Sequence, residues 1–261
     1  MILLLGGTSE SLVLMTKLLE KKEEVVLSVA TEYGKVFSKQ FEPHVVQKRM
    51  DPFEMEAFIL EKGVHLVLDA THPFADLVSK NAIQACKKTN VPYIRFERPQ
   101  MKWNDKVELT DSVEEACHLA LEKIQPEETI YLTTGSKTLS EYLTYIPVEK
   151  LVIRVLPTAE VLANCEALGF EAQQIHALKG PFTKDLNQSL YQKNQSRVMI
   201  TKESGLRGGM ESKLAAAQAL DMTVIVIRRP KVDYPIVFEE MSKLFTYLES
   251  LRKRDKHDES K

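Results

Sequence analysis

A glycine pair with hydroxyl residues stands where the first apolar run meets a helix-forming segment, in the sequence ILLLGGTSES. Gly6 and Gly7 permit a tight turn with close backbone approach, and the free N–H groups of a following helix attract a phosphate. Thr8 and Ser9 can cap that helix or donate hydroxyl protons to the anion. The spacing differs from G-x-G-x-x-G, so the alternative is a pair that only lets the strand turn. The first turn of a doubly wound sheet binds dinucleotides, which favours the phosphate interpretation.

A second polar group, Asp69, Thr71 and His72 in LDATHPFAD, follows another apolar run. Ligands of parallel sheets bind at the carboxyl ends of strands, so these side chains are candidates for contact with a ligand. Pro73 suits the first position of a helix from Phe74, with His72 at its cap. Imidazole is suited to proton transfer near neutral pH, although His72 could instead only orient its neighbours. No second histidine or cysteine stands at ligand spacing, so no metal is expected.

An acidic residue follows the second apolar run, in LSVATEYGK. Glu32 is placed to accept hydrogen bonds from an adenosine ribose and to repel a 2′-phosphate, which favours NADH over NADPH. Alternatively, Glu32 belongs to the first turn of the next helix, where a carboxylate suits the dipole without any ligand. Lys35 is close enough to reverse the preference. The candidate cofactor-binding residues are Gly6, Gly7, Thr8, Ser9, Glu10, Ser28, Ala30, Thr31, Glu32, Asp69, Ala70, Thr71 and His72.

Composition limits the class of protein. The 261 residues are 44% hydrophobic, enough for a sizeable core, and the net charge of -2 favours neither nucleic acid nor an anionic membrane. No stretch approaches the about 20 apolar residues of a membrane span, and the amino terminus lacks the features of a signal peptide. Cys86, Cys117 and Cys165 show no spacing of a zinc site or disulfide framework. We therefore expect a cytoplasmic globular protein.

The elements that must position these residues follow an alternating pattern. Short β-branched runs alternate with amphipathic segments, which predicts an α/β fold with two parallel sheets. Strands are expected at 2–5, 25–30, 45–47, 64–69, 92–96, 129–133, 151–155, 174–177, 197–200 and 223–227. Helices are expected at 9–21, 33–40, 52–62, 74–89, 112–123, 138–145, 158–168, 184–193, 211–220 and 235–251. The segment RPQMKWNDKVEL between the two series is interpreted as a crossover.

Ordered sequence blocks carry a family resemblance. LLGGTSE, DATHPFA and VPYIRFERP are followed by TIYLTTGSKTL, VIRVLP, GPF, TKESGLRGGMESKLAAAQAL and VIVIRRP. In this order they resemble the motifs of the precorrin-6A reductase family of cobalamin biosynthesis, which includes cobalt-precorrin-6A reductases. The resemblance covers most of the chain as far as Asp255. A different interpretation is a nucleotide-binding sensor with Rossmann-like domains, or a transferase that uses another nucleotide-bearing donor.

The resemblance implies an oxidoreductase that transfers a hydride from NADH or NADPH to precorrin-6A or its cobalt form. It implies two Rossmann-like domains, a dinucleotide-binding domain at 1–105 and a substrate domain at 106–255, with the active-site cleft between them. The final helix could pack on the first domain, and 256–261 is expected to be a disordered tail. The sequence ATEYG in the second turn resembles the family members that act on the cobalt-bearing substrate more than those that act on the metal-free one. The implied partner is a tetrapyrrole-derived small molecule, with room for transient contact with neighbouring pathway enzymes.

A flat macrocycle fringed with carboxylates requires basic residues and backbone N–H groups, and loops of the second half supply them. The loop TKESG precedes a helix whose amino terminus also attracts an anion. The structural alternatives are that Gly135 and Gly205 only permit turns and that Lys202 is a solvent-exposed charge without a ligand. Lys202 and Ser204 are also candidates for catalysis, with His72. The candidate substrate-binding residues are Arg95, Thr134, Gly135, Ser136, Arg154, Gly180, Pro181, Phe182, Lys202, Ser204, Gly205 and Lys213.

Overall fold

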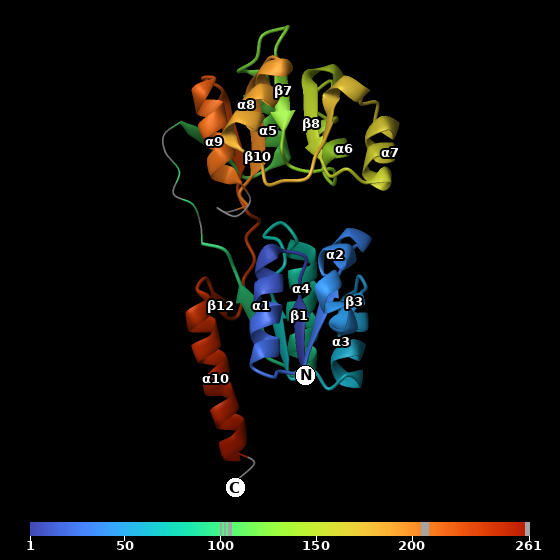
Figure 1. The fold of residues 1–261 in the computed structure, drawn as a ribbon, viewed down its shortest axis with the longest axis vertical. Helices are drawn as coiled ribbons and strands as arrows, with labels where there is room; N and C mark the ends of the chain where they lie inside the picture. Colours follow the sequence, from blue (N-terminus) through green and yellow to red (C-terminus); the bar gives the residue numbers. More distant parts are fainter. Residues whose placement is uncertain (100, 102, 104–105, 205–208, 259–261) are drawn as a thin grey trace. The chain divides into compact units, whose positions relative to one another are not determined.

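The chain forms two compact units (Figure 1). The computed structural model describes residues 1–99, 101, 103, 106–204 and 209–258. One unit contains Met1–Pro99 and Pro230–Lys261, and the other contains Gln100–Arg229. The chain therefore leaves the first unit, builds the second and returns. This division places the final helix with the first unit, the alternative considered above, whereas the range 106–255 assigned it to the second.

The first unit is built on a six-stranded sheet in the order β12-β5-β4-β1-β2-β3, with all strands parallel. Residues of β1 alternate between the two faces: Ile2 and Leu4 pack in one apolar cluster, and Leu3 and Leu5 pack in the other. Because both faces are covered, the strand is an uninterrupted apolar run. The strands are β1 (Ile2–Leu5), β2 (Val25–Val29), β3 (Val45–Gln47), β4 (Leu66–Asp69), β5 (Tyr93–Phe96) and β12 (Val237–Phe238). The helices are α1 (Ser9–Glu20), α2 (Glu32–Phe37), α3 (Pro52–Glu61), α4 (Asp76–Thr89) and α10 (Met241–Asp258), with a 3-10 helix at Lys39–His44.

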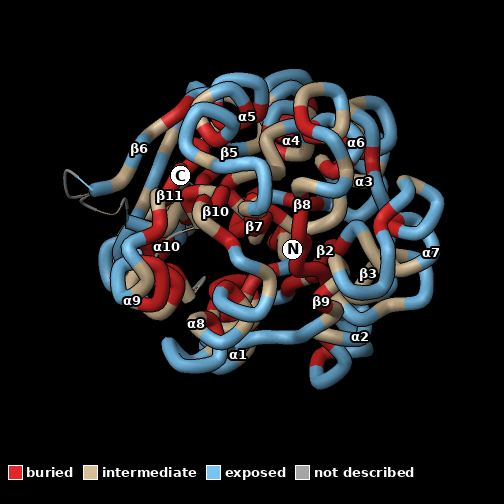
Figure 2. The backbone as a smooth tube through the Cα atoms, turned by 90° about the horizontal axis from the view of Figure 1, so that it is seen from above, coloured by how far each residue is buried: buried red, intermediate tan, exposed pale blue. Residues whose placement is uncertain are grey.

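The second unit repeats this architecture in the order β6-β11-β10-β7-β8-β9, again with parallel pairs. Most residues of its central strands are buried, whereas most residues of the connecting segments are exposed (Figure 2). The strands are β6 (Val107–Thr110), β7 (Thr129–Leu132), β8 (Leu151–Val155), β9 (Ile175–Ala177), β10 (Ser196–Lys202) and β11 (Thr223–Ile227). The helices are α5 (Val113–Leu121), α6 (Leu139–Tyr142), α7 (Ala159–Ala167), α8 (Lys184–Lys193) and α9 (Met210–Ala219), with 3-10 helices at Val148–Lys150 and Ala172–Gln174.

Two edge strands, β6 and β12, were not predicted from the sequence. β12 lies within the predicted helix 235–251, and α10 begins only at Met241. The reason is tertiary: Arg95 N donates to Ile236 O at 2.8 Å, and Glu97 N donates to Phe238 O at 2.9 Å. α10 continues to Asp258, into the segment predicted as a disordered tail, and 259–261 lie outside the described residues. In the described part of the chain, no helix has both the length and the apolar character to cross a membrane.

The His-Pro stretch forms a turn and not the start of a helix. Ala75 N donates to His72 O at 2.8 Å, which closes a β-turn with Pro73 at its second position. α4 begins at Asp76, so the predicted helix start at Phe74 is wrong. Proline fits both settings because each needs a φ near −65°, and the local sequence does not distinguish them.

The strand order brings the candidate turns together. β1 and β4 are neighbours, with Leu5 in register with Asp69, although β2 and β3 separate them in the chain. In the second sheet β7 is likewise the neighbour of β10, with Leu132 in register with Ile200. The strand order therefore changes direction between β4 and β1 in the first sheet and between β10 and β7 in the second. Ligands of α/β sheets bind at the carboxyl ends of the strands where the order changes direction.

Candidate functional site

The glycine turn after β1 is shaped by packing. A Cβ at Gly6 would lie 2.5 Å from Leu27 Cδ1 and 2.9 Å from Ser11 Oγ, and Gly7 has a φ of +106°. Thr8 caps α1 by accepting from Ser11 N at 3.1 Å, and it donates to Ala70 O at 2.7 Å. Gly7 N and Thr8 N both donate to Ser11 Oγ at 3.2 Å. The turn is thus tied to the end of β4, and the hydroxyl of Thr8 acts as a cap. Ser11 was not a sequence candidate.

Glu10, a predicted cofactor ligand, forms an ion pair within the first unit. Arg98 Nη2 lies 2.5 Å from Glu10 Oε2, and Ser9 Oγ donates to the same oxygen at 3.1 Å. Burial favours a raised pKa, but the hydrogen bond and charge of Arg98 outweigh it and lower the pKa of Glu10. The pair brings the segment after β5 to the glycine turn.

Asp69 at the end of β4 is the centre of a buried hydrogen-bond network. Its side chain is fully buried and accepts from Thr71 N at 2.9 Å and Thr71 Oγ1 at 2.7 Å. It also accepts from Ser79 Oγ and Tyr93 OH, each at 2.6 Å, and from Arg95 Nη1 at 2.7 Å. Burial and the Asp69 charge raise the pKa of Tyr93 well above its usual range. Asp69 thus organises the end of this strand through hydrogen bonds within the protein.

Arg95 is part of the same network. Its Nε donates to Glu97 Oε2 at 3.0 Å and its Nη2 donates to Thr71 O at 3.0 Å, while the guanidinium lies 5.2 Å from the ring centre of Tyr234. Burial opposes the charge of Arg95, but Asp69 and Glu97 outweigh it and raise its pKa. A buried guanidinium held by two carboxylates offers little positive field to a ligand. The geometry therefore favours a structural role over the predicted substrate contact.

His72 is half-buried in the turn after β4. Phe74 N donates to His72 Nδ1 at 3.2 Å, and the two rings lie 5.9 Å apart. Because Nδ1 accepts this bond, the proton of the neutral imidazole resides on Nε2. His72 can therefore donate a proton or a hydrogen bond from Nε2. It lies two residues after Ala70, whose carbonyl oxygen accepts the hydrogen bond from Thr8.

The end of β2 provides the remaining cofactor candidates. Gly6 N donates to the buried Ser28 at its carbonyl oxygen, at 2.9 Å, so this end lies beside the glycine turn. Thr31 caps α2 by accepting from Gly34 N at 3.0 Å, and Glu32 is the exposed first residue of α2. Both interpretations of Glu32 fit this position. Ala30 is exposed before the cap.

Two buried cations lie near the carboxyl edge of the second sheet. Arg154 in β8 and Lys213 in α9 are each only 7% exposed. Arg154 Nη1 donates to Asn187 Oδ1 at 2.6 Å, and its guanidinium lies 4.1 Å from the ring centre of Phe182. Lys213 Nζ donates to Thr201 Oγ1 at 3.5 Å. Burial, with the charge of Arg154, lowers the pKa of Lys213 to about 7.

Among the described residues, no carboxylate compensates the charges of Arg154 and Lys213. Across the described residues, no acidic side chain forms an ion pair with Arg154 or Lys213. Glu203, a buried acid after β10, lies instead 3.8 Å from Arg229 Nε. A buried cation without a carboxylate partner is costly, and an anionic ligand would compensate its charge. Arg154 and Lys213, both predicted substrate residues, are therefore the candidate anion-binding residues of the second unit.

The other candidates of the second unit surround the same sheet edge. Lys202, at the end of β10, donates to Thr138 Oγ1 at 3.3 Å, and burial lowers its pKa. Gly135 has a φ of +78°, so its turn requires glycine. Gly205 lies outside the described residues. Thr134, Gly135 and Ser136 follow β7, Ser204 follows β10, and Gly180, Pro181 and Phe182 precede α8.

Asn187 was not predicted from the sequence, because it lies within a helix and most candidate residues lie at strand ends. It lies in α8 and is fully buried. Its one sequence signal is helical spacing: Asn187 and the buried Tyr191 are four residues apart, on the inward face of a polar helix. A buried polar residue on such a face marks a hydrogen-bond partner inside the unit.

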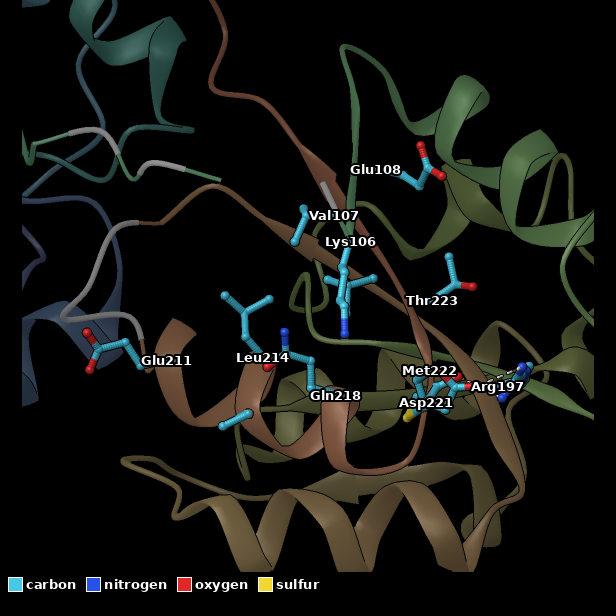
Figure 3. Close-up of a pocket in the computed structure, with 12 residues that line it drawn as sticks. Lys106, Val107, Glu108, Arg197, Glu211, Leu214, Gln218, Asp221, Met222 and Thr223 are labelled. Atoms are coloured by element: carbon cyan, nitrogen blue, oxygen red, sulfur yellow. Dashed lines mark hydrogen bonds and ion pairs between the residues drawn. The ribbon is translucent and has the colours of Figure 1, made fainter. Parts of the chain in front are cut away.

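The second unit has a hollow of about 540 Å³ (Figure 3). Lys106, Leu214, Gln218 and Thr223 are among the residues that line it. It opens at the amino ends of β6 and β11, whereas ligands of parallel sheets bind at the carboxyl ends. Within the described residues, no cluster of three or more His, Cys, Asp or Glu side chains could hold a metal ion.

The fold and these edges define a class of protein with two Rossmann-like α/β units, with a glycine turn in the first and two buried basic residues near the sheet edge of the second. The family of precorrin-6x reductases, CbiJ/CobK, matches residues 1–249, and the chain belongs to this family. The family expected from the sequence blocks is thereby confirmed. The chain is an oxidoreductase of cobalamin biosynthesis, which implies a reduced nicotinamide donor.

Curated relatives cover nearly the whole chain. It is 39% identical over 242 residues to a cobalt-precorrin-6A reductase of Priestia megaterium, across 91% of this chain and 94% of the relative. It is 35% identical over 254 residues to that of Methanocaldococcus jannaschii, across 96% and 99%. A precorrin-6A reductase of Sinorhizobium sp is 29% identical over 246 residues, across 90% and 88%. The solved structure of CobK precorrin-6A reductase matches with a TM-score of 0.76 and 23% identity, across 95% and 96%, which confirms the two-sheet fold.

Proposed function

We propose that the protein transfers a hydride from a reduced nicotinamide nucleotide to cobalt-precorrin-6A and forms the dihydro product. The observation that carries this proposal is the buried pair Arg154 and Lys213, which suits the carboxylates of such a macrocycle in a chain of this reductase family. The relatives named for the cobalt-bearing substrate are up to 39% identical, and those named for precorrin-6A are 29% identical. This difference supports the cobalt form as substrate.

The residues of the chain divide the work between the two units. The nicotinamide supplies the hydride when bound, and the glycine turn after β1 with the amino terminus of α1 supports its pyrophosphate. Arg154 and Lys213 hold substrate carboxylates and Lys202 adds positive charge at the same edge. His72, with its Nε2 proton, is the proposed proton donor to the macrocycle carbon beside the one that accepts hydride.

The His72→Ala variant is expected to lower kcat about 100-fold, the usual contribution of a general acid, with less than about a twofold change in the KM for NADH. The measurement is anaerobic turnover followed by the macrocycle spectrum. His44→Ala, which changes an exposed histidine at the end of the 3-10 helix Lys39–His44, serves as the control. Full turnover in His72→Ala would show that a substrate group or water supplies the proton.

The Glu32→Ala variant is expected to narrow the preference for NADH over NADPH about fivefold, because it removes an exposed negative charge from the ribose end. The ratio of kcat/KM for the two cofactors measures this. Lys35→Ala is the matched variant and should increase the preference for NADH, since it removes a positive charge from the same helix. An unchanged ratio in Glu32→Ala would leave Glu32 as a helix-start carboxylate only.

The proposed function is tested by anaerobic incubation of the protein with cobalt-precorrin-6A or precorrin-6A and each reduced nicotinamide. The expected result is a spectral change of the macrocycle with equal oxidation of the nicotinamide, faster with the cobalt form. Faster reduction of the metal-free form would reverse the substrate assignment. No turnover with any of the four pairs would overturn the proposal.

A further inference from the structure

Arg154 and Lys213 in the second unit have neutral hydrogen-bond partners. Arg154 Nη1 donates to an amide oxygen of Asn187, and Lys213 Nζ donates to a hydroxyl of Thr201. In the first unit, by contrast, the buried Arg95 lies 2.7 Å from a carboxylate oxygen of Asp69 and 3.0 Å from one of Glu97. A neutral acceptor orients a guanidinium without cancelling its charge, whereas a carboxylate does both.

Asn187 connects three elements around Arg154. Its Oδ1 accepts from Arg154, and its Nδ2 donates to Thr183 O at 2.8 Å and to Ser212 Oγ at 3.4 Å. Ser212 directly precedes Lys213 in α9, so the amide of Asn187 links α8, α9 and β8. All these groups are neutral apart from the two cations. The amide is fully buried and thus acts through its neighbours.

Phe182 completes the setting of Arg154. The guanidinium lies 4.1 Å from the Phe182 ring centre and 5.9 Å from that of Tyr131. Aromatic faces attract a guanidinium without neutralising it. Arg154 is therefore oriented by two rings and an amide, and its full positive charge is retained in a buried site, where electrostatic interactions are strongest.

We propose that Asn187 is a positioning residue for substrate binding, which orients the Arg154 guanidinium while leaving its charge for a substrate carboxylate. The identity of that substrate rests on the proposed function. Two substitutions separate this role from plain structural support. Asn187→Asp keeps an oxygen acceptor for Arg154 but cancels its charge, whereas Asn187→Leu removes the acceptor and keeps the charge.

The experiment compares these variants with the wild type through two readouts. The first is KM and kcat with cobalt-precorrin-6A and NADH. The second is binding of uroporphyrin III, a polycarboxylate macrocycle, followed by fluorescence, which needs neither nicotinamide nor turnover. The control is Asn194→Asp, the same chemical change at the other end of α8, where the amide contacts Leu190 O and His176 Nε2 instead of Arg154.

For Asn187→Asp, we expect the KM for the macrocycle and the Kd for uroporphyrin to rise about 10-fold to 100-fold, the range of a lost contact to a charged group. The effect of Asn187→Leu should be smaller, with kcat and the KM for NADH within about twofold of wild type in both variants. A structural role predicts the opposite ranking, since Asp is the closer mimic of Asn. If Asn187→Leu fails to fold, the comparison of macrocycle binding by Asn187→Asp and Asn194→Asp decides whether Asn187 is a positioning residue.

The outcomes distinguish this inference from the proposed function. If Asn187→Asp binds both macrocycles as tightly as wild type, or more tightly than Asn187→Leu, the inference is overturned while turnover by the wild type keeps the proposed function. If the wild type binds uroporphyrin but reduces no corrinoid, the proposed function fails and the uroporphyrin ranking alone decides the role of Asn187. Absence of uroporphyrin binding by the wild type also overturns the inference.

Discussion

The Lys213→Met variant is expected to bind the macrocycle about 10-fold to 100-fold more weakly, since it lacks one buried contact between a cation and a carboxylate. The same variant should be more stable than wild type by about 1–4 kcal/mol, because methionine fills the space without an unpaired buried charge. Weaker binding combined with higher stability is the behaviour of a residue retained for function.

The differences in stability and binding between wild type and Lys213→Met depend on pH, because the pKa of Lys213 is lowered to about 7. An unfolded lysine holds its proton to about pH 10.4, whereas folded Lys213 loses it at about 7. Between these values the unfolded chain binds more protons, so wild-type stability rises with pH in this window relative to Lys213→Met. The advantage of the variant is thus greatest below about pH 7. Because a bound carboxylate favours the charged amine, wild-type KM should increase as the pH rises through about 7.

Urea unfolding between pH 6 and pH 9 and KM measurements over the same range test these statements, with all buffers at equal ionic strength. Lys193→Met, which removes an exposed lysine at the end of α8, is the control and should change neither quantity. A Lys213→Met protein that is less stable than wild type at pH 6, or that binds the macrocycle normally, would show that the Lys213 charge is compensated.

The Asp69→Ala variant is expected to lose about 3–5 kcal/mol of unfolding free energy, because one partner of a buried ion pair is removed. Arg95 would keep Glu97 but lose Asp69, and the hydroxyl groups of Ser79 and Tyr93 would lose their acceptor. The measurement is urea unfolding at pH 7, followed by NADH binding on the fraction that remains folded.

Asp111→Ala provides the matched comparison. Asp111 forms an ion pair with Arg228 at 2.8 Å, but both side chains are largely exposed, so the expected loss is below about 1 kcal/mol. If Asp69→Ala were as stable as Asp111→Ala and failed only to bind NADH, Asp69 would be a direct cofactor ligand, as the sequence predicted. The comparison of the two variants therefore shows whether Asp69 supports the buried hydrogen-bond network or binds the cofactor directly.

Most elements could be predicted from the sequence because their determinants are local. The short apolar run ILLL places β1 at Ile2–Leu5, and the polar and apolar spacing of α8 predicts Lys184–Lys193 with the observed bounds. The failures were non-local. β12 is only two residues long and exists through its hydrogen bonds to β5, so its own sequence carries almost no strand signal.

The sequence by itself determined the two βα series, the glycine turn at Gly6 and Gly7, and the family, because alternation and ordered blocks are properties of the chain. Only the tertiary structure decided the environment of each charge. Arg95 and Arg154 are both strand arginines that looked alike as substrate ligands, yet one is buried between carboxylates and the other beside Asn187. The physical reason is that a sequence specifies a charge, whereas its compensation depends on partners brought together by folding.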